Sequence, residues 1–431
     1  MRRGMAAFLT LAAAACAAEV VFVVPGTDVI SQDSTPNDTT DNGGGGGLQR
    51  VGLVVVVALA AEDAAVGPAV GAGANGRLVG VDVRVTRVGT VGEHVGTTDS
   101  AGQVTFTGLL PGDFEASALR VLTAEERAAL GPDFADVTAL AGGGRTQVAR
   151  GTGGLVVEAV AGRPGSLVIS EVFPAWIQVG DNSYVYATYL EVYNNTDTTI
   201  YLDGMLVGRA LGAVFDFPNS PCSVTQAWQA DPDGLWTRDV LRLPGSGQEY
   251  PLLAGTAAVI ATDAIDHSAV DPQLPNLATA DFESIGAADV DNPAVPNATI
   301  LMAAQLTFFG RGIMFRGPIF FVARPTSLDS LPKGRLYDDD FVRIPRPAIL
   351  DVLATIYSEA NQAALGYVLC PVFIHPAFDR QFVRASGVAA EMYSIVRRQG
   401  TVVNGRTVLQ RTRTSARDFL RVDFPTPATV P

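Results

Sequence analysis

The residues best suited to chemistry gather in one acidic segment of the chain. Positions 263 to 291 hold seven carboxylates and one histidine: Asp263, Asp266, His267, Asp271, Asp281, Glu283, Asp289 and Asp291. Ca²⁺ takes about six to eight oxygen ligands, and its candidate ligands here are Asp263, Asp266, Asp281 and Glu283. The spacing matches neither an EF-hand nor a Gly/Asp nonapeptide repeat. A solvated acidic loop is therefore the preferred interpretation, and a calcium site is the alternative.

Two further arrangements have the residue types of acid–base chemistry. His267 follows Asp266, as a general base beside an orienting carboxylate would. Glu171 and Glu191 fall on two adjacent predicted strands, and a pair of carboxylates at a suitable separation hydrolyses glycosides. However, no nucleophile motif such as GxSxG accompanies the histidine, and paired carboxylates arise by chance in any sheet. We therefore expect that the protein is not an enzyme.

Aromatic residues supply a candidate binding surface. All three tryptophans lie within residues 163–431, the larger of the two expected domains, and Trp176 and Trp228 fall in stretches predicted as loops. Exposed aromatic faces stack on sugar rings and form hot spots in protein interfaces. Tyr189 and Tyr193 lie on a predicted strand, where packing in the core is expected. Trp176 and Trp228 are therefore the candidate ligand-binding residues.

The N-terminus has the layout of a signal peptide. Arg2-Arg3 is followed by the apolar stretch Met5–Ala15, which is too short to cross a membrane comfortably, and then by Cys16. A cysteine directly after small residues resembles a lipoprotein signal, in which Cys16 becomes the lipid-carrying N-terminus. The alternative is an ordinary secretory signal, cut after Ala15 or Ala18.

The other two cysteines form an even pair if Cys16 is lipidated. Exported proteins fold in an oxidising compartment, where Cys222 and Cys370 are able to form a disulfide that closes a long loop. Such a bridge would stabilise the fold by up to about 5 kcal/mol in the chain-entropy description. Two separate buried thiols are the other possibility, and the sequence leaves both open.

Composition favours an all-β protein with more than one domain. The chain has 431 residues, of which 48% are hydrophobic and only 17% charged, with 45 glycines and 26 prolines. Few charges and many turn residues suit short strands. The net charge of −14 argues against nucleic-acid binding, which needs Lys and Arg to neutralise phosphates. We divide the chain into a signal peptide (1–15), an anchor and polar Gly-rich linker (16–47), and two folded domains (48–162 and 163–431).

The first domain carries a specific pattern of strands and turns. Val51–Leu59 is predicted as a strand buried on both faces and Val79–Val88 as a half-buried strand, and Thr123–Glu126 is a capping box that begins a helix ending near Leu130. The turns Thr98–Gly102 and Gly108–Phe114 separate further strands. This order resembles the carboxypeptidase-regulatory-like, transthyretin-type β-sandwich. The resemblance implies seven strands and a role as a spacer or carbohydrate-binding-like module.

The second domain resembles the lamin-tail-type, immunoglobulin-like sandwich. The resemblance rests on three segments: Leu167–Phe173, Thr188–Asn195 and Thr199–Gly204. Residues 205–250 and 265–350 are then expected as insertions. The full length is similar to an uncharacterised family of bacterial envelope lipoproteins, through Ala264–His267, Ala280–Glu283 and Ser415–Phe419. That family has no established function.

These observations predict a non-catalytic lipoprotein, anchored to the outer membrane and facing the periplasm or the exterior. Its expected role is binding a glycan or an outer-membrane partner protein, with no cofactor. The alternatives are a calcium-dependent or hydrolytic enzyme that uses the segment Asp263–Asp291, and a structural stalk or adhesive. Converging carboxylates would favour the enzyme, and an aromatic groove would favour the binding module.

Overall fold

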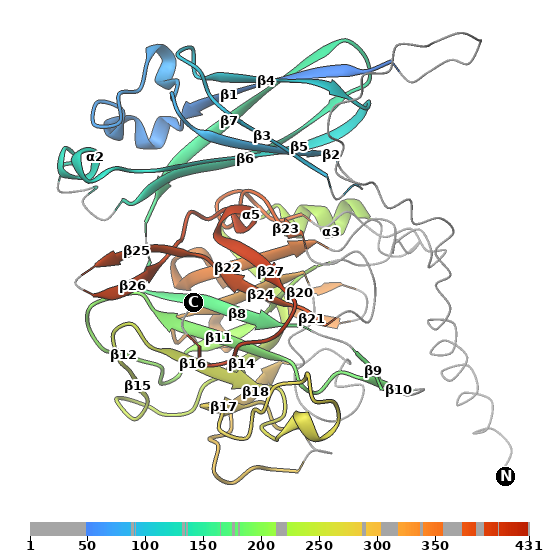
Figure 1. The fold of residues 1–431 in the computed structure, drawn as a ribbon. Helices are drawn as coiled ribbons and strands as arrows, with labels where there is room; N and C mark the ends of the chain where they lie inside the picture. The colour runs from blue at the N-terminus through green and yellow to red at the C-terminus, as the bar shows by residue number, and fades with distance from the viewer. Residues whose placement is uncertain are drawn as a thin grey trace, which may run out of the picture. The chain divides into compact units, whose positions relative to one another are not determined.

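The chain folds into β-sheets over almost all of its described length (Figure 1). The computed structural model describes residues 49–87, 90, 92–131, 134, 137–163, 165–174, 177–179, 182–212, 222–286, 290–302, 318–336, 339–356, 373–384, 392–403 and 405–429. Gln49–Pro431 forms one compact unit. Within the described residues, no helix has both the length and the apolar character needed to span a membrane. The expected all-β fold class is confirmed.

The N-terminal strands form a sandwich from one folded-over sheet. Its strands run in the order β3-β2-β5-β6-β7-β1-β4. They are β1 (Val51–Leu59), β2 (Asp82–Arg87), β3 (Glu93–Thr97), β4 (Gln103–Leu109), β5 (Gly112–Val121), β6 (Ala139–Val148) and β7 (Thr152–Gly162). β6 and β7 pair only over a short stretch, in which Ala139–Ala141 of β6 lie opposite Val160–Gly162 of β7. Beyond that short ladder the sheet divides into two layers, and their inner faces enclose the core.

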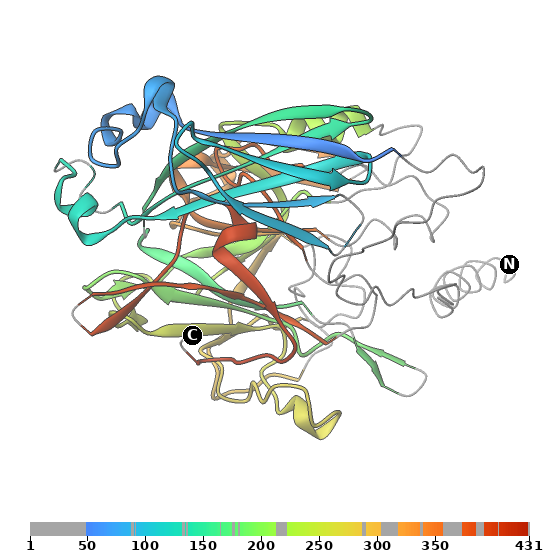
Figure 2. The ribbon, with the colours of Figure 1, turned by 45° about the horizontal axis from the view of Figure 1, so that its top comes forward.

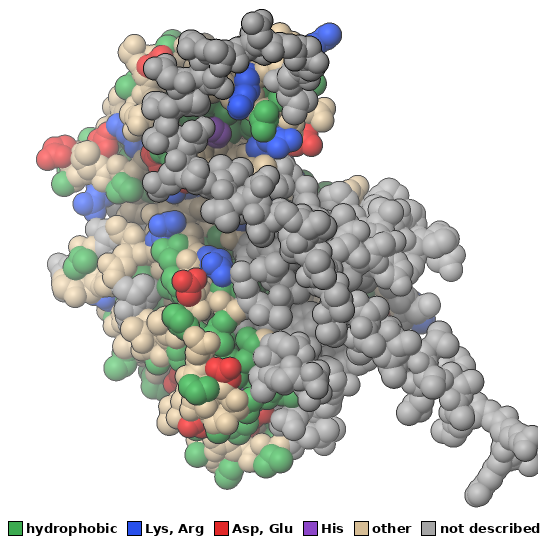
Figure 3. All heavy atoms as spheres, turned by 45° about the vertical axis from the view of Figure 1, so that its right-hand side comes forward, with side chains coloured by type: hydrophobic (Ala, Val, Ile, Leu, Met, Phe, Trp, Pro, Cys, Tyr) green, Lys and Arg blue, Asp and Glu red, His purple; other side chains and the backbone are tan. Residues whose placement is uncertain are grey.

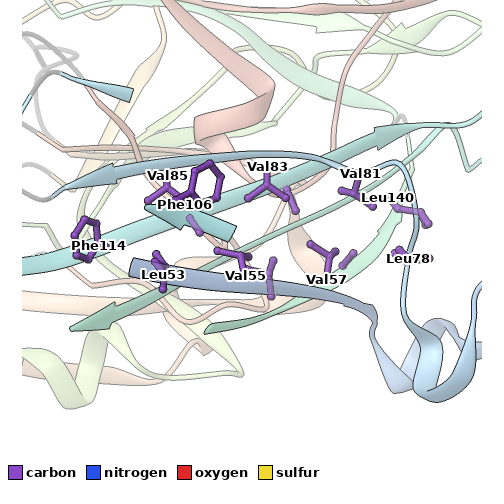
Figure 4. Close-up of a cluster of buried hydrophobic side chains, with 14 of the residues drawn as sticks. Leu53, Val55, Val57, Leu78, Val81, Val83, Val85, Phe106, Phe114 and Leu140 are labelled. Carbon is purple, nitrogen blue, oxygen red and sulfur yellow. The ribbon is translucent and has the colours of Figure 1, made fainter. Parts of the chain in front are cut away.

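Alternation along the strands decides which side chains enter this core. Leu53, Val55 and Val57 of β1 lie opposite Val83 and Val85 of β2, all without solvent exposure (Figure 4). The predicted half-buried strand at β2 is therefore confirmed. The prediction that β1 is buried on both faces is wrong, because the residues between those three inward-facing side chains are only half-buried. Only one face of this layer meets the opposite layer.

The turn motifs of the first domain build turns, as their residue types predict. The Asp99 carboxylate accepts hydrogen bonds from the backbone N–H of Ala101 (2.8 Å) and Gln103 (3.1 Å). Gly102 adopts a φ of +68°, which disfavours any residue with a Cβ. Thr123 caps helix α2 (Ala124–Ala128) through the reciprocal bonds of the predicted capping box. The helix ends two residues earlier than the sequence indicates.

The remaining strands form a second sandwich of two sheets. The six-stranded sheet has the order β17-β16-β11-β8-β24-β27. Its strands are β8 (Leu167–Phe173), β11 (Tyr189–Asn194), β16 (Ala257–Ala261), β17 (Phe282–Glu283), β24 (Ser394–Arg397) and β27 (Phe419–Val422). The facing sheet has the strands β13 (Leu206–Ala210), β14 (Gly234–Arg242), β18 (Thr299–Met302), β19 (Ile319–Ala323), β20 (Lys333–Leu336), β21 (Asp339–Pro345), β22 (Ile349–Ile356) and β23 (Val383–Arg384). One continuous apolar core lies between the two sheets.

Short elements surround this second sandwich. They are the pairs β9 (Ile177–Val179) and β10 (Asn182–Tyr184), β12 (Ile200–Tyr201) and β15 (Pro251–Leu252), β25 (Gln399–Val403) and β26 (Arg406–Leu409), and the helices α3 (Cys222–Gln229) and α5 (Ser415–Asp418). Residues 205–250 and 265–350, expected as insertions, supply β13, β14, β17–β21 and the start of β22. All of these strands except β17 belong to the facing sheet. Without that sheet, one apolar face of the six-stranded sheet would be exposed to water.

Replacement of Gly102 by alanine tests whether this turn depends on its glycine. A Cβ at Gly102 would lie 2.7 Å from the Cβ of Arg77, whereas Gly151 has a similar φ of +66° and open space around it. We expect Gly151→Ala to lower the free energy of unfolding by about 1–2 kcal/mol, the cost of the left-handed backbone alone. Gly102→Ala should lower it further because of the clash, as measured by urea denaturation. Equal losses in the two variants would contradict this account.

Candidate functional site

Glu171 and Glu191 face each other across two neighbouring strands. β8 and β11 are antiparallel, and their register places Glu191 directly opposite Glu171. The register then shifts, so that Ser170 and Glu171 both lie opposite Glu191 in a β-bulge. Leu190 and Val192 point into the core between the sheets, so Glu191 lies on the outer face of the sheet. Both glutamates are only 1% exposed.

Serine hydroxyls hold the two carboxylates from within the sheet. The Ser170 hydroxyl donates to Oε1 of Glu191 at 2.6 Å. The Ser394 hydroxyl, on β24, donates to Oε1 of Glu171. The sheet therefore supplies one donor to each carboxylate, and the remaining acceptor positions need donors from another part of the chain.

The C-terminal segment supplies those donors. We call residues 423–429 the strap, because they run back from β27 across β8 and β11 (Figures 1 and 2). Thr426 donates its backbone N–H (3.0 Å) and its hydroxyl (2.9 Å) to the two oxygens of Glu171. Ala428 donates its backbone N–H to Oε2 of Glu191 at 2.7 Å. The carboxylate pair is thus closed off from solvent by the end of its own chain.

Burial and like charge make this pair a proton-binding site. The pKa of Glu191 is raised from 4.5 to about 8, mainly by burial and in smaller part by the charge of Glu171, against the opposing bonds from Ser170 and Ala428. Burial also raises the pKa of Tyr189 well above its ordinary value, with Glu171 adding to the effect. Two facing carboxylates cannot both ionise without penalty. Near neutral pH the arrangement therefore holds a proton on Glu191.

The acidic segment is organised differently from a metal site. Glu283 is buried and accepts the backbone N–H groups of Ala264 (3.0 Å) and Asn292 (3.1 Å). The Asp281 carboxylate accepts from the Val259 backbone N–H at 2.8 Å, and burial raises its pKa. The described residues contain no group of three or more His, Cys, Asp or Glu placed to hold a metal ion. These two carboxylates fix the path of the loop.

His267 is a buried structural residue with assignable protonation. Its Nε2 lies 2.9 Å from the carbonyl oxygen of Asp263, which is itself buried, and its Nδ1 lies 2.6 Å from the Tyr184 hydroxyl. A carbonyl only accepts, so Nε2 carries a hydrogen and donates it to Asp263, while Nδ1 is engaged with the Tyr184 hydroxyl. The Asp266 carboxylate instead accepts from Ser268, capping the short 3-10 helix His267–Ala269. The hypothesis that Asp266 orients His267 is therefore wrong.

Trp228 packs against other aromatic side chains. It lies in helix α3 and not in a loop as predicted, and its ring stacks on Trp236 with centroids 4.3 Å apart. Phe341 meets it edge-on at 5.5 Å. The two indoles lie over Gly334, where a Cβ would come within 2.6 Å of Trp228. The stacked tryptophans are half-buried, so much of the Trp228 surface is used within the chain.

Four other predicted positions remain untested. Trp176, Cys16, Cys370 and Asp289 lie outside the described residues. Cys222 begins helix α3, but its side chain is not described. The structure therefore brings Glu171 and Glu191 together, and the lipidation, the disulfide and the proposed groove between Trp176 and Trp228 stay predictions.

A buried ionic network joins the two sheets of the second sandwich. The sequence analysis did not predict it. Arg397 of β24 is 1% exposed and pairs with Asp351 of β22 in the facing sheet. Its other N–H groups reach the carbonyls of Ile169 (2.5 Å) and Gln410 (2.9 Å). Its guanidinium lies over the Phe419 ring at 4.1 Å. The available signal was an arginine that directly follows Ile395 and Val396 at the end of the short strand Ser394–Arg397.

The segment Ser415–Phe419 continues this network. The Ser415 hydroxyl donates to the buried carboxylate of Asp379 at 2.6 Å. Asp418 accepts from the backbone N–H and hydroxyl of Thr412. Burial raises the pKa of Asp379 and of Asp418. The residues that carried the sequence resemblance at this position are therefore engaged in packing and hydrogen bonding.

Arg417 extends the network to the N-terminal sandwich. Its guanidinium donates to the Asp82 carboxylate (3.1 Å) and to the carbonyls of Asp82 and Ser117 (both 2.8 Å). Arg384 likewise pairs with the buried carboxylate of Glu115 at 2.8 Å. Burial lowers the pKa of Arg417 to about 10, which still leaves it charged at neutral pH. Two arginines thus fix strands β2 and β5 to α5 and β23.

Comparisons with known proteins give one informative likeness. No family model matches the sequence, and no curated protein matches it. This chain is similar in fold to a DUF4876 family protein from Bacteroides thetaiotaomicron. The two are 17% identical, with a TM-score of 0.51 over 88% of this chain and 98% of that one. At that identity the likeness concerns the fold alone.

Two pilins give much weaker similarities. A streptococcal ancillary pilin is 14% identical over 32% of this chain and 43% of its own, with a TM-score of 0.15. The major pilin SpaD from Corynebacterium diphtheriae is 8% identical over 39% of this chain and 42% of its own, also with a TM-score of 0.15.

Replacement of Glu191 by glutamine tests the buried proton. Because the folded-state pKa is raised, its stabilising effect is full below about pH 4.5 and is lost as the pH rises towards 8. Each unit of pKa shift corresponds to about 1.4 kcal/mol, so we expect the wild type to lose several kcal/mol between about pH 5 and pH 8. Glu191→Gln should remove this loss in urea denaturation. An unchanged pH dependence would contradict the assignment.

Replacement of Arg397 by methionine tests the inter-sheet ion pair. The variant leaves Asp351 buried without its closest cation, so we expect a loss of about 3–5 kcal/mol in the free energy of unfolding. Arg421→Met is the matched control, since that arginine forms an exposed pair with Asp423 at 3.4 Å. The control should lose less than about 1 kcal/mol. Comparable losses in both variants would show that the buried pair has no special role.

Proposed function

We propose that this chain is a non-catalytic, lipid-anchored protein of the bacterial cell envelope that binds a partner through its larger sandwich. One observation carries the non-catalytic part of the proposal. The groups best suited to chemistry, Glu171, Glu191, Glu283 and His267, are buried and hydrogen-bonded to the chain itself. A catalytic group must reach a substrate atom, directly or through one water. Here those contacts are made by the protein's own backbone and hydroxyls.

The sequence supports the anchoring part of the proposal. An apolar stretch ending at Ala15, then Cys16, and a polar Gly-rich linker over residues 31–47 fit a lipid anchor followed by a tether. Two all-β sandwiches joined by buried arginines would then stand away from the membrane. We propose that these are a carboxypeptidase-regulatory-like sandwich and a lamin-tail-like domain. The strand order and the fold likeness to the DUF4876 family protein are consistent with that proposal.

The partner that fits best is an outer-membrane protein. The acidic segment exposes three apolar side chains, Ile265 (37%), Val270 (40%) and Val290 (80%), beside the exposed carboxylate of Asp266 and the half-buried one of Asp271. Hydrophobic side chains lie among acidic ones on the lower part of the face in Figure 3. Apolar residues ringed by polar ones are typical of protein interaction surfaces. A glycan partner would instead use aromatic faces, and Trp228 offers little free ring surface.

Replacement of Cys16 by serine tests the anchor and the partner in one experiment. We expect wild type and the control Cys222→Ser to sediment with membranes, and Cys16→Ser to become soluble, because only Cys16 carries lipid. The same envelope protein should co-purify with all three, and be lost from a variant with Ile265 and Val270 changed to aspartate. Membrane-bound Cys16→Ser would refute the anchor. Recovery of a glycan, or of no partner, would refute the protein-binding part.

A further inference from the structure

The strap over the carboxylate pair is attached mainly by polar bonds. Its residues Asp423, Phe424, Thr426, Ala428 and Thr429 are exposed, and the two prolines between them are half-buried. Within the described residues, its hydrogen bonds to the carboxylates of the sheet are the two from Thr426 and the one from Ala428. Burial of apolar side chains stabilises β8 and β11 beneath the strap. It therefore contributes little to the attachment of the strap itself.

The strap sequence restricts how it is able to bind. Pro425 and Pro427 have no backbone N–H, so Thr426 and Ala428 carry the amides of this stretch. Both of those amides are used on the carboxylates. Ala428 also adopts a φ of +60°, a left-handed conformation that costs a non-glycine residue about 1–2 kcal/mol. The carboxylates thus hold the strap in a conformation that it would not favour alone.

Few charged groups other than the pair itself face this site. Glu171 comes from β8, and Tyr189 lies beside Glu191 on β11. Asp281, which follows β16, adds a smaller like-charge effect on Glu191. On the strap, Asp423 pairs with Arg421 at 3.4 Å. β16 contributes only Ala, Val and Ile, and Arg397 of β24 is turned to the other side of the sheet, towards Asp351. Glu191 therefore has an anion opposite it and no cation paired with it among the described residues.

We propose that the strap is a proton-controlled cover, which lifts when Glu191 gives up its proton and uncovers the outer face of β8 and β11. Burial opposes a second negative charge beside Glu171 more strongly than the bonds from Ser170 and Ala428 favour it, so water must stabilise that charge. Water has no route from the inner side, where Leu190 and Val192 pack in the core. The strap is the thin, exposed element over both carboxylates, so its release hydrates them with the least loss of packing. This proposal does not depend on the partner proposed above.

The proton linkage fixes the pH range of the opening. In the closed state burial raises the pKa of Glu191 to about 8, and in the open, hydrated state the pKa returns towards 4.5. Opening therefore releases one proton between these values, and its equilibrium constant rises about tenfold per pH unit. Below this range Glu191 is protonated in both states, and above it Glu191 is ionised in both. The opening equilibrium is then independent of pH at either end.

Hydrogen exchange of the strap amides in the full chain measures this equilibrium. We expect the protection factors of Thr426 and Ala428, corrected for intrinsic exchange rates, to fall about tenfold per pH unit from about pH 5 to pH 8 and then to level off. Glu191→Gln should keep the high, pH-independent protection of the low-pH state. Glu158→Gln, a change at an exposed glutamate of β7, should behave as wild type.

A second variant keeps the proposal falsifiable if Glu191→Gln fails to fold. Glu171→Gln removes the facing charge, so the fall in protection should end at a lower pH than in wild type. Wild-type protection that does not change with pH would overturn the proposal. So would a wild-type pH dependence that persists in Glu191→Gln. Strap protection that falls together with that of β8 and β11 amides would also overturn it, because it would report unfolding of the whole sandwich.

Discussion

A guanidinium buried between two sheets needs hydrogen-bond acceptors from the protein for its N–H groups, because water is absent there. Arg397 is such a group, and its contacts constrain both sheets. Its partners come from β22, β8, the turn at Gln410 and the ring of Phe419. These contacts fix the spacing and register of the two sheets, because displacement of either sheet would leave a buried charge unpaired. Asp351 is held in turn by Arg411 at 2.9 Å and by the Ile169 backbone N–H. Apolar burial alone would tolerate many small shifts of one sheet on the other.

The buried carboxylates on the outer face of the six-stranded sheet also need partners, but they obtain them in another way. There the bulge at Ser170 places two carboxylates opposite each other, and no arginine faces them among the described side chains. Retention of a proton on Glu191 and donors from the strap replace a cation. A paired arginine is charged at any ordinary pH, whereas a shared proton is exchangeable. Arg397 therefore keeps its charge as the pH changes, whereas a proton on Glu191 is exchangeable.

Local patterns in the sequence predicted local structure well. Alternating valines predicted β2, the residues Thr123 and Glu126 predicted the cap of α2, and Asp99 with Gly102 predicted a turn. Each prediction rests on interactions within a few residues of the chain. The failures involve contacts between distant segments. Trp228 lies in a helix against Trp236, and six of the eight strands of the facing sheet come from the segments expected as insertions.

The sequence by itself determined the all-β class, the turn positions and the presence of carboxylates on neighbouring strands, because propensity and alternation act over short distances. Only the tertiary structure decided what those carboxylates do. Thr426 lies 255 positions from Glu171, and Ser394 lies 223 from it. Hydrogen bonds between such residues leave no periodic trace in the sequence. Burial, which raises the pKa of Glu191, likewise exists only once the strap and the sheet have come together.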